Sequence, residues 1–481
     1  MLALNSLSGE LNAILIKELR QELRVRGFVW SFIGFHIVMI IFTLSSFAIL
    51  DLEHEWAMML GTTMFWMMLA IPLFIAVPVR AFTAFSKEAN AKELELIFLT
   101  HTSSWQIVFY KWCALCLQGL LLLTAALPYV IVRYVVGSLD LLDAFASLGL
   151  LLLITMLLTA AALVISAQHA HRPRVSIFKM IICLVIGLPL ANQIITFTIF
   201  GFFHLGSFGS ILGTRAPVVM LVYAIFVLLL LLEFAASRIS TRAENHAYVK
   251  RLLGILALGT GVIFHASDIG NPWFIDTVVG LYVLLICISA LCEEPVYVQS
   301  IYAPFMRGSA WKRYLGVWFY PGWPSGAVYT LSICVLFFTT MSWMRYTPLP
   351  ESQFGGIAVA AGLCLPLVFA NVLWPHLHKK WWLYVLVQAV LLIGSFALVQ
   401  KAPRHTCSTL YGTDYTLSLL PISAFALAFE SRRFCPVPGA TALASIGIFL
   451  LLALPWWRVW QQVRHTENRS RAALEEQRQH G

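Results

Sequence analysis

The chain has 481 residues, of which 60% are apolar and only 11% are charged. A soluble protein of this length needs more charge to cover its surface, so the composition excludes an ordinary soluble fold. The net charge is 32 − 23 = +9. The Lys and Arg residues stand in small groups beside apolar runs rather than in basic blocks. This distribution is typical of a membrane protein with basic cytoplasmic loops, and it argues against nucleic acid as a partner.

Apolar runs of about 20 residues, long enough to cross a hydrocarbon core about 30 Å thick, recur from end to end of the chain. They predict an all-α, polytopic transmembrane helical bundle of about 12 spans. A kink is expected in the second span, at Pro72 and Pro78. The predicted spans are 28–50, 56–79, 112–135, 141–167, 180–203 and 216–236 in the first half, and 252–265, 274–292, 325–343, 356–374, 381–399 and 440–457 in the second.

The stretch 413–429 has two interpretations, because Pro421 interrupts it and its apolar character is moderate. If it spans, the C-terminal tail lies outside; if it does not, the tail lies inside. With twelve spans, 25 Lys and Arg fall inside and 5 fall outside. The positive-inside rule therefore favours twelve spans, a cytoplasmic N-terminus and a charged cytoplasmic tail at 461–481.

An amphipathic segment precedes the first span. Leu11, Leu15, Leu19 and Leu23 recur every four residues, and charged residues lie between them. This pattern predicts a helix that is too charged to span and that lies in the membrane interface within residues 1–27. Its charged positions include Lys17, Glu18, Arg20 and Arg24.

The connection after the second span, predicted to be cytoplasmic from Arg80 to Lys111, mixes charged and apolar residues. A short, half-apolar helix between two spans is suited to docking on a soluble partner, although an ordinary interfacial loop has a similar composition. Thr102, Ser103 or Ser104 could cap the helix that leads into the third span. The positions predicted to dock a partner are Lys87, Glu88, Lys92, Glu93, Glu95 and Phe98.

Motifs for covalent chemistry and nucleotide binding are missing from the sequence. No Gly-x4-Gly-Lys-Ser/Thr string is present to wrap phosphates, and His54-Glu55 lacks the second His of a zinc protease motif. His36 and Glu233 are the ionisable residues expected within spans, and they form no carboxylate relay. The sequence therefore predicts no catalytic residue, no cofactor and no metal site in this chain.

Two stretches of the first half resemble permease subunits of the ABC-2 type, the membrane half of type-2 ABC exporters. The segment 12–28, with Lys17-Glu18-Leu19-Arg20 at its centre, resembles the interfacial elbow helix that opens that family. The segment 93–111, continuing through Leu127-Pro128, is similar to the family's coupling helix and third span. Glu93 stands where the family usually has Thr, and His101 stands in place of a Pro.

The resemblance implies a function and an organisation. Residues 28–237 would form a six-span membrane domain with a coupling helix near 85–104. Residues 238–460 would form a second membrane half of about six spans, with a cytoplasmic loop at 293–324. An ATP-binding cassette ATPase would dock on the coupling helix, bind the ATP and drive export of a substrate that the sequence does not identify.

The resemblance also implies a bacterial inner membrane as the location. Twelve spans could form a whole pore or half of a dimer, so a homodimer or a second permease chain stays open. Two other functions stay open from the residues alone. One is a structural or assembly subunit of a membrane complex that does not transport. The other is a membrane enzyme acting on lipid or glycan.

Overall fold

The computed structural model describes about three fifths of the chain, and every regular element in that part is helical. Eight of the described helices are long and apolar enough to cross a membrane. The chain is therefore an all-α integral membrane protein. Its contacts divide it into two compact units, 1–241 and 242–481. The described residues are 15–20, 23–24, 26–50, 64–90, 103–135, 141–168, 216–240, 244–267, 269, 272–306, 310–345, 357, 359–367, 387 and 438–480.

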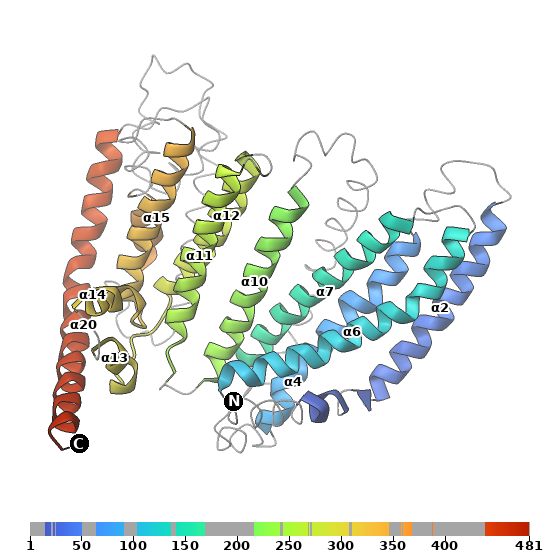
Figure 1. The fold of residues 1–481 in the computed structure, drawn as a ribbon, viewed down its shortest axis with the longest axis horizontal. Coiled ribbons are helices and arrows are strands. Elements are labelled where there is room, and N and C mark those ends of the chain that lie inside the picture. The colour runs from blue at the N-terminus through green and yellow to red at the C-terminus, as the bar shows by residue number, and fades with distance from the viewer. Residues whose placement is uncertain are drawn as a thin grey trace, which may run out of the picture. The chain divides into compact units, whose positions relative to one another are not determined.

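The first unit packs its helices around α7. Residues 15–20 are helical and precede α2 (Arg26–Leu50). The other long helices in this unit are α6 (Ser104–Val135), α7 (Leu141–Gln168) and α10 (Ala216–Ile239) (Figure 1). α7 packs against α4 (Val77–Asn90), α6 and α10. Threonine hydroxyls in α7 donate to carbonyls one turn back, as Thr155 does to Leu151 at 2.7 Å, so they are satisfied without water.

The second span departs from a regular α-helix at the proline expected to kink it. Pro72 opens a one-turn π-helix, η1 (Pro72–Ala76), and α4 follows directly. Proline has no N–H to donate to the preceding turn, which makes a local change in the helical repeat favourable. The helix also runs on to Asn90, well past the end predicted at residue 79. The helix is thus about three turns longer than the predicted span, and the start of the cytoplasmic segment at Arg80 stays a prediction.

The third span begins with a capping box, as the Ser and Thr residues before it predicted. The Ser103 hydroxyl accepts a hydrogen bond from the Gln106 amide at 3.3 Å, and the Gln106 side chain accepts one from the Ser103 amide at 3.1 Å. This reciprocal pair satisfies two amides that have no partner inside the helix. α6 thus starts eight residues before the predicted boundary at Trp112.

The second unit begins with a hairpin of α11 (His246–Ala266) and α12 (Pro272–Leu291), and α12 packs on α15 (Trp323–Arg345). Asn245 caps α11 by accepting a hydrogen bond from the Tyr248 amide at 3.3 Å. Between α12 and α15 the chain forms two short helices, α13 (Gln299–Met306) and α14 (Ala310–Phe319) (Figure 1). The loop predicted at 293–324 is therefore largely helical.

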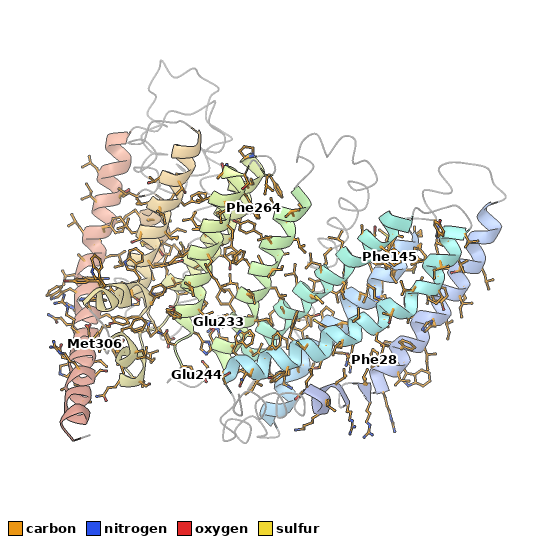
Figure 2. All side chains as sticks on the ribbon, in the orientation of Figure 1. Phe28, Phe145, Glu233, Glu244, Phe264 and Met306 are labelled. Carbon is orange, nitrogen blue, oxygen red and sulfur yellow. The ribbon has the colours of Figure 1, made fainter. Side chains whose placement is uncertain are left out.

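The last helix, α20 (Pro438–His480), joins the predicted final span and the predicted tail in one continuous element. Its second half packs on α13, where Trp460 and Val463 share a hydrophobic cluster with Tyr302 and Met306 (Figure 2). The Trp456 indole N–H also donates to the carbonyl of Pro324 at 3.0 Å. The end of α20 and the α12–α15 connection therefore lie at the same end of the second unit (Figure 1).

Some of the twelve predicted spans lie within the described residues and others do not. The spans predicted at 180–203 and 381–399 and the stretch 413–429 lie almost wholly outside them, as does about half of 356–374. The count of twelve spans accordingly stays a prediction.

Candidate functional site

Each unit has a buried ion pair at one end of its helices, the end that the Lys and Arg distribution predicts to be cytoplasmic. We call this the inner end. In the first unit it contains residues 15–20, the start of α2, the end of α4 and the start of α6. In the second unit it contains the start of α11, the end of α12, and α13 and α14.

A buried ion pair joins the amphipathic segment of the first unit to the third span. The Nζ of Lys111, in the second turn of α6, lies 3.2 Å from Oε2 of Glu18. The exposed fractions of the two side chains are 6% and 11%, so water screens the pair little. Lys111 also lies 5.7 Å from the centre of the Phe85 ring, on α4. The ammonium group of this α6 residue therefore contacts residues from two other elements.

A second set of polar contacts lies one to two turns further along the same helices. Arg80 of α4 donates a hydrogen bond to the Gln118 side-chain oxygen of α6 at 2.6 Å, and its guanidinium lies 5.2 Å from the Phe28 ring centre of α2. The Phe85 amide donates to the Ser166 hydroxyl of α7 at 3.1 Å. With the ion pair, these contacts form the first-unit cluster: Glu18, Phe28, Arg80, Phe85, Lys111, Gln118 and Ser166.

The first-unit cluster connects the helices on either side of the predicted coupling helix. α4 ends at Asn90 and α6 begins at Ser104, so the segment 91–103 joins two helices that are held to each other by buried charge. A force applied to that segment would act on both helices together. The cluster also includes Glu18, so the same force would reach the segment before the first span.

The residues predicted to dock a partner fall partly within the described structure. Lys87 and Glu88 lie on the last turns of α4. Lys92, Glu93, Glu95 and Phe98 lie outside the described residues. Of the four amphipathic-segment positions, Lys17, Arg20 and Arg24 are exposed, whereas Glu18 is buried against Lys111. Glu18 is thus a buried structural residue, whereas the three cations lie on the surface.

The second-unit cluster is organised around Arg251, whose side chain is fully buried in α11. Its guanidinium lies 2.7 Å from the Glu293 carboxylate and donates to the Trp318 carbonyl at 2.6 Å and to the Ser325 hydroxyl at 3.0 Å. The Tyr329 hydroxyl donates to the backbone carbonyl of Arg251 at 2.9 Å. The cluster comprises Lys250, Arg251, Glu293, Trp318, Gly322, Ser325 and Tyr329.

Glu293 is the single acidic member of that cluster and contacts both cations. Its second oxygen lies 2.7 Å from the Nζ of Lys250. Burial by itself raises the pKa of the Glu293 carboxyl, but the charges and hydrogen bonds of Lys250 and Arg251 outweigh burial and lower it. Glu293 is therefore held ionised, and it ties the exit of α12 to the start of α11.

The turn before α15 fits closely against the chain that leaves α12. Gly322 has a φ of +118°, and a side chain there would collide with Pro295. Only glycine adopts this backbone conformation without strain. The Trp323 amide then donates to the Glu293 carbonyl at 2.9 Å. The connection from α12 to α15 is thus fixed at both its beginning and its end.

Two further polar pairs lie within the spans. In the first unit, Nδ1 of His36 on α2 lies 2.9 Å from the Tyr129 hydroxyl on α6. In the second, Nε2 of His265 lies 2.6 Å from Asp276, which joins α11 to α12 at the end opposite the second-unit cluster. Glu233, the other ionisable residue expected in a span, is buried in α10 (Figure 2). Polar pairs of this kind hold spans together where water is scarce.

Sequence reasoning missed both pairings on which the clusters depend. The sequence pattern marks Lys111 only as the end of a predicted cytoplasmic connection, and Arg251 only as the residue before a predicted span. The partners are 93 residues apart for Glu18 and Lys111, and 42 apart for Arg251 and Glu293. Only one signal pointed to them: each lies beside an apolar run, where an unpaired charge is costly.

Comparison with known protein families, curated proteins and solved structures finds no match for this chain. Within the described residues, no group of three or more His, Cys, Asp or Glu side chains is arranged to hold a metal ion.

Proposed function

We propose that this chain is the membrane-spanning permease subunit of an ATP-binding cassette transporter, with a separate ATPase subunit that docks on the segment 85–104. Closure of the ATPase on ATP would move this segment, and the spans would respond by exporting a substrate. The chain itself binds no nucleotide in this proposal. Its location would be a bacterial inner membrane, with the N-terminus in the cytoplasm.

One observation supports the proposal most strongly: the first-unit cluster links the helices on both sides of that segment. A docking element is useful for transport only if its movement reaches the spans. The Glu18–Lys111 ion pair and the Arg80–Gln118 hydrogen bond are suited to this, because they couple α4, α6 and the amphipathic segment. Breaking such buried pairs costs several kcal/mol, about 3–5, so the elements would move together.

Co-purification tests the docking partner. The full-length protein is solubilised in mild detergent from its native membrane, and the captured material is assayed for ATP hydrolysis and identified by mass spectrometry. The test variant is the double reversal Glu93→Lys/Glu95→Lys. The matched control is Glu475→Lys/Glu476→Lys, which changes charge equally on the predicted cytoplasmic tail.

The proposal expects an ATPase with the wild type and the tail control, and its loss with the coupling-segment variant. An ATPase that is retained in all three would place docking elsewhere on the chain. No ATPase in any of them would overturn the transporter proposal, and a structural subunit or a membrane enzyme would then replace it.

A further inference from the structure

The short helix α14 has an exposed aromatic face that the proposed function does not use. Trp311 and Tyr314 have exposed fractions of 76% and 74%, and Trp318 is 36% exposed. Their spacing of three and four residues places them on one side of the helix. A surface of this size and composition on one ten-residue helix calls for an apolar or interfacial neighbour.

The other side of α14 packs firmly on the second unit. Phe319 is 9% exposed, and Gly316 lies so close to Tyr320 and Phe305 that an added Cβ would crowd them. The Trp318 carbonyl also accepts the hydrogen bond from buried Arg251. These contacts hold α14 in one orientation, so its aromatic face is presented as a fixed surface.

The position of α14 identifies the level at which that face lies. α14 belongs to the connection between α12, which ends at Leu291, and α15, which begins at Trp323, at the inner ends of both spans. Those spans expose aliphatic residues such as Leu285 and Leu336 to their surroundings. Such exposed aliphatic side chains are typical of spans that face lipid, and α14 lies between the inner ends of the two spans, where the predicted topology has the cytoplasmic boundary of the bilayer.

We propose that α14 binds the membrane interface through Trp311, Tyr314 and Trp318, as an in-plane anchor of the second unit. Tryptophan and tyrosine are enriched at this depth because one end of each ring system is apolar and the other donates a hydrogen bond. The same ten residues carry Lys312 and Arg313, whose charges suit anionic headgroups. This binding is independent of the proposed ATPase.

The second-unit cluster joins this anchor to the spans. Arg251 fixes α14 to α11 and α15 through the Trp318 carbonyl and the Ser325 hydroxyl. An anchor works only if it is rigidly joined to the spans that it positions. We therefore infer that the buried charge of this unit serves to hold the interfacial helix at a set depth.

Photo-crosslinking in a bilayer tests the anchor. The photoreactive residue p-benzoylphenylalanine replaces Trp311 or Tyr314 in the full-length protein, reconstituted in nanodiscs of phosphatidylethanolamine and phosphatidylglycerol. The same residue at Trp30, which is 71% exposed on α2, is the lipid-facing control. At exposed Arg469 on α20, about 18 Å beyond Trp457 along the helix axis, it is the water-facing control.

After irradiation, attached lipid is measured as a mass increase of the protein. The anchor predicts lipid attachment at positions 311 and 314 within about twofold of position 30, and roughly tenfold above position 469. Yields at 311 and 314 no higher than at 469 would overturn the proposal. It would also be overturned if, in native membranes, both positions attached to a soluble protein and not to lipid, since the face would then be a protein interface.

Discussion

The two units differ in how buried charges contact the connection between two of their spans. Each has a connection between two spans at its inner end, residues 91–103 in the first unit and residues 292–322 in the second. In the first unit the buried charges join the helices that flank the connection, through Glu18–Lys111 and Arg80–Gln118. In the second unit the buried charge bonds to the connection itself, through Arg251 and the Trp318 carbonyl.

This difference suggests different mechanical roles for the two connections. A connection whose own backbone accepts hydrogen bonds from a buried guanidinium is part of the rigid body of its unit. A connection between two clamped helices can instead transmit a force applied from outside. The comparison therefore favours a structural role for α13 and α14 and a coupling role for 91–103. Substitutions in each cluster test the two roles separately.

The largest effect is expected from Arg251→Met. The substitution leaves Glu293 with Lys250 alone and removes the donor to the Trp318 carbonyl, so the unfolding free energy should fall by about 3–5 kcal/mol. Thermal unfolding of the purified full-length protein measures it. Arg238→Met, at an exposed position in the last turn of α10, should change stability by less than about 0.5 kcal/mol. Equal melting temperatures for both variants would contradict a structural role for the second-unit cluster.

A charge swap tests the first-unit cluster. Glu18→Lys alone places two buried cations together and should cost about 3 kcal/mol, as should Lys111→Glu. The double variant Glu18→Lys/Lys111→Glu restores an opposite pair, and it should recover at least half of that loss. The measurements are thermal unfolding and the amount of co-purified ATPase. If the double variant is no more stable and captures no more ATPase than either single variant, the Glu18–Lys111 pair does not carry the proposed coupling.

A smaller effect is expected at the contact between α12 and α15. A Cβ on Gly326 would press against the Ala290 carbonyl, a backbone atom that cannot rotate away. Gly326→Ala should therefore cost about 1–3 kcal/mol by forcing the two helices apart. Gly447→Ala on α20 is the matched control, because nothing lies within 4 Å of the added atom. Comparable melting temperatures would show that the second unit is less rigid than its packing implies.

The smallest expected effect is a dependence of the folding stability on acidic pH. The pKa of Glu293 lies below its ordinary value of 4.5, so its ionised form stabilises the folded state. That contribution is present above pH 4.5 and is lost as the pH falls through the lowered pKa. The stability gap between wild type and Glu293→Gln should therefore narrow as the pH drops below 4.5. A gap that stays constant down to pH 3 would mean that the carboxylate charge is not what matters.

Much of the helical framework was predictable because the physics of spans is local. Apolar runs predicted α2, α7, α10 and α12 closely, and Ser103 was among the three residues expected to cap the third span. The continuation of the helix beyond residue 79 was not predicted, because Arg80 is typical of a residue in water. Arg80 donates a hydrogen bond to Gln118, and no local pattern encodes a partner 38 residues away.

The sequence by itself determined that this is an all-helical membrane protein with basic inner ends, because length, hydropathy and charge distribution act through the solvent and need no partner. Tertiary structure alone decided which charges are structural. Glu18 is buried against Lys111 while the cations beside it are exposed, and Arg251 is buried against Glu293 at the centre of the second-unit cluster. A charge can be buried in this way only where packing supplies its counter-charge. Within the predicted loop 293–324, the same packing stabilises the helices α13 and α14 and leaves the aromatic face of α14 exposed.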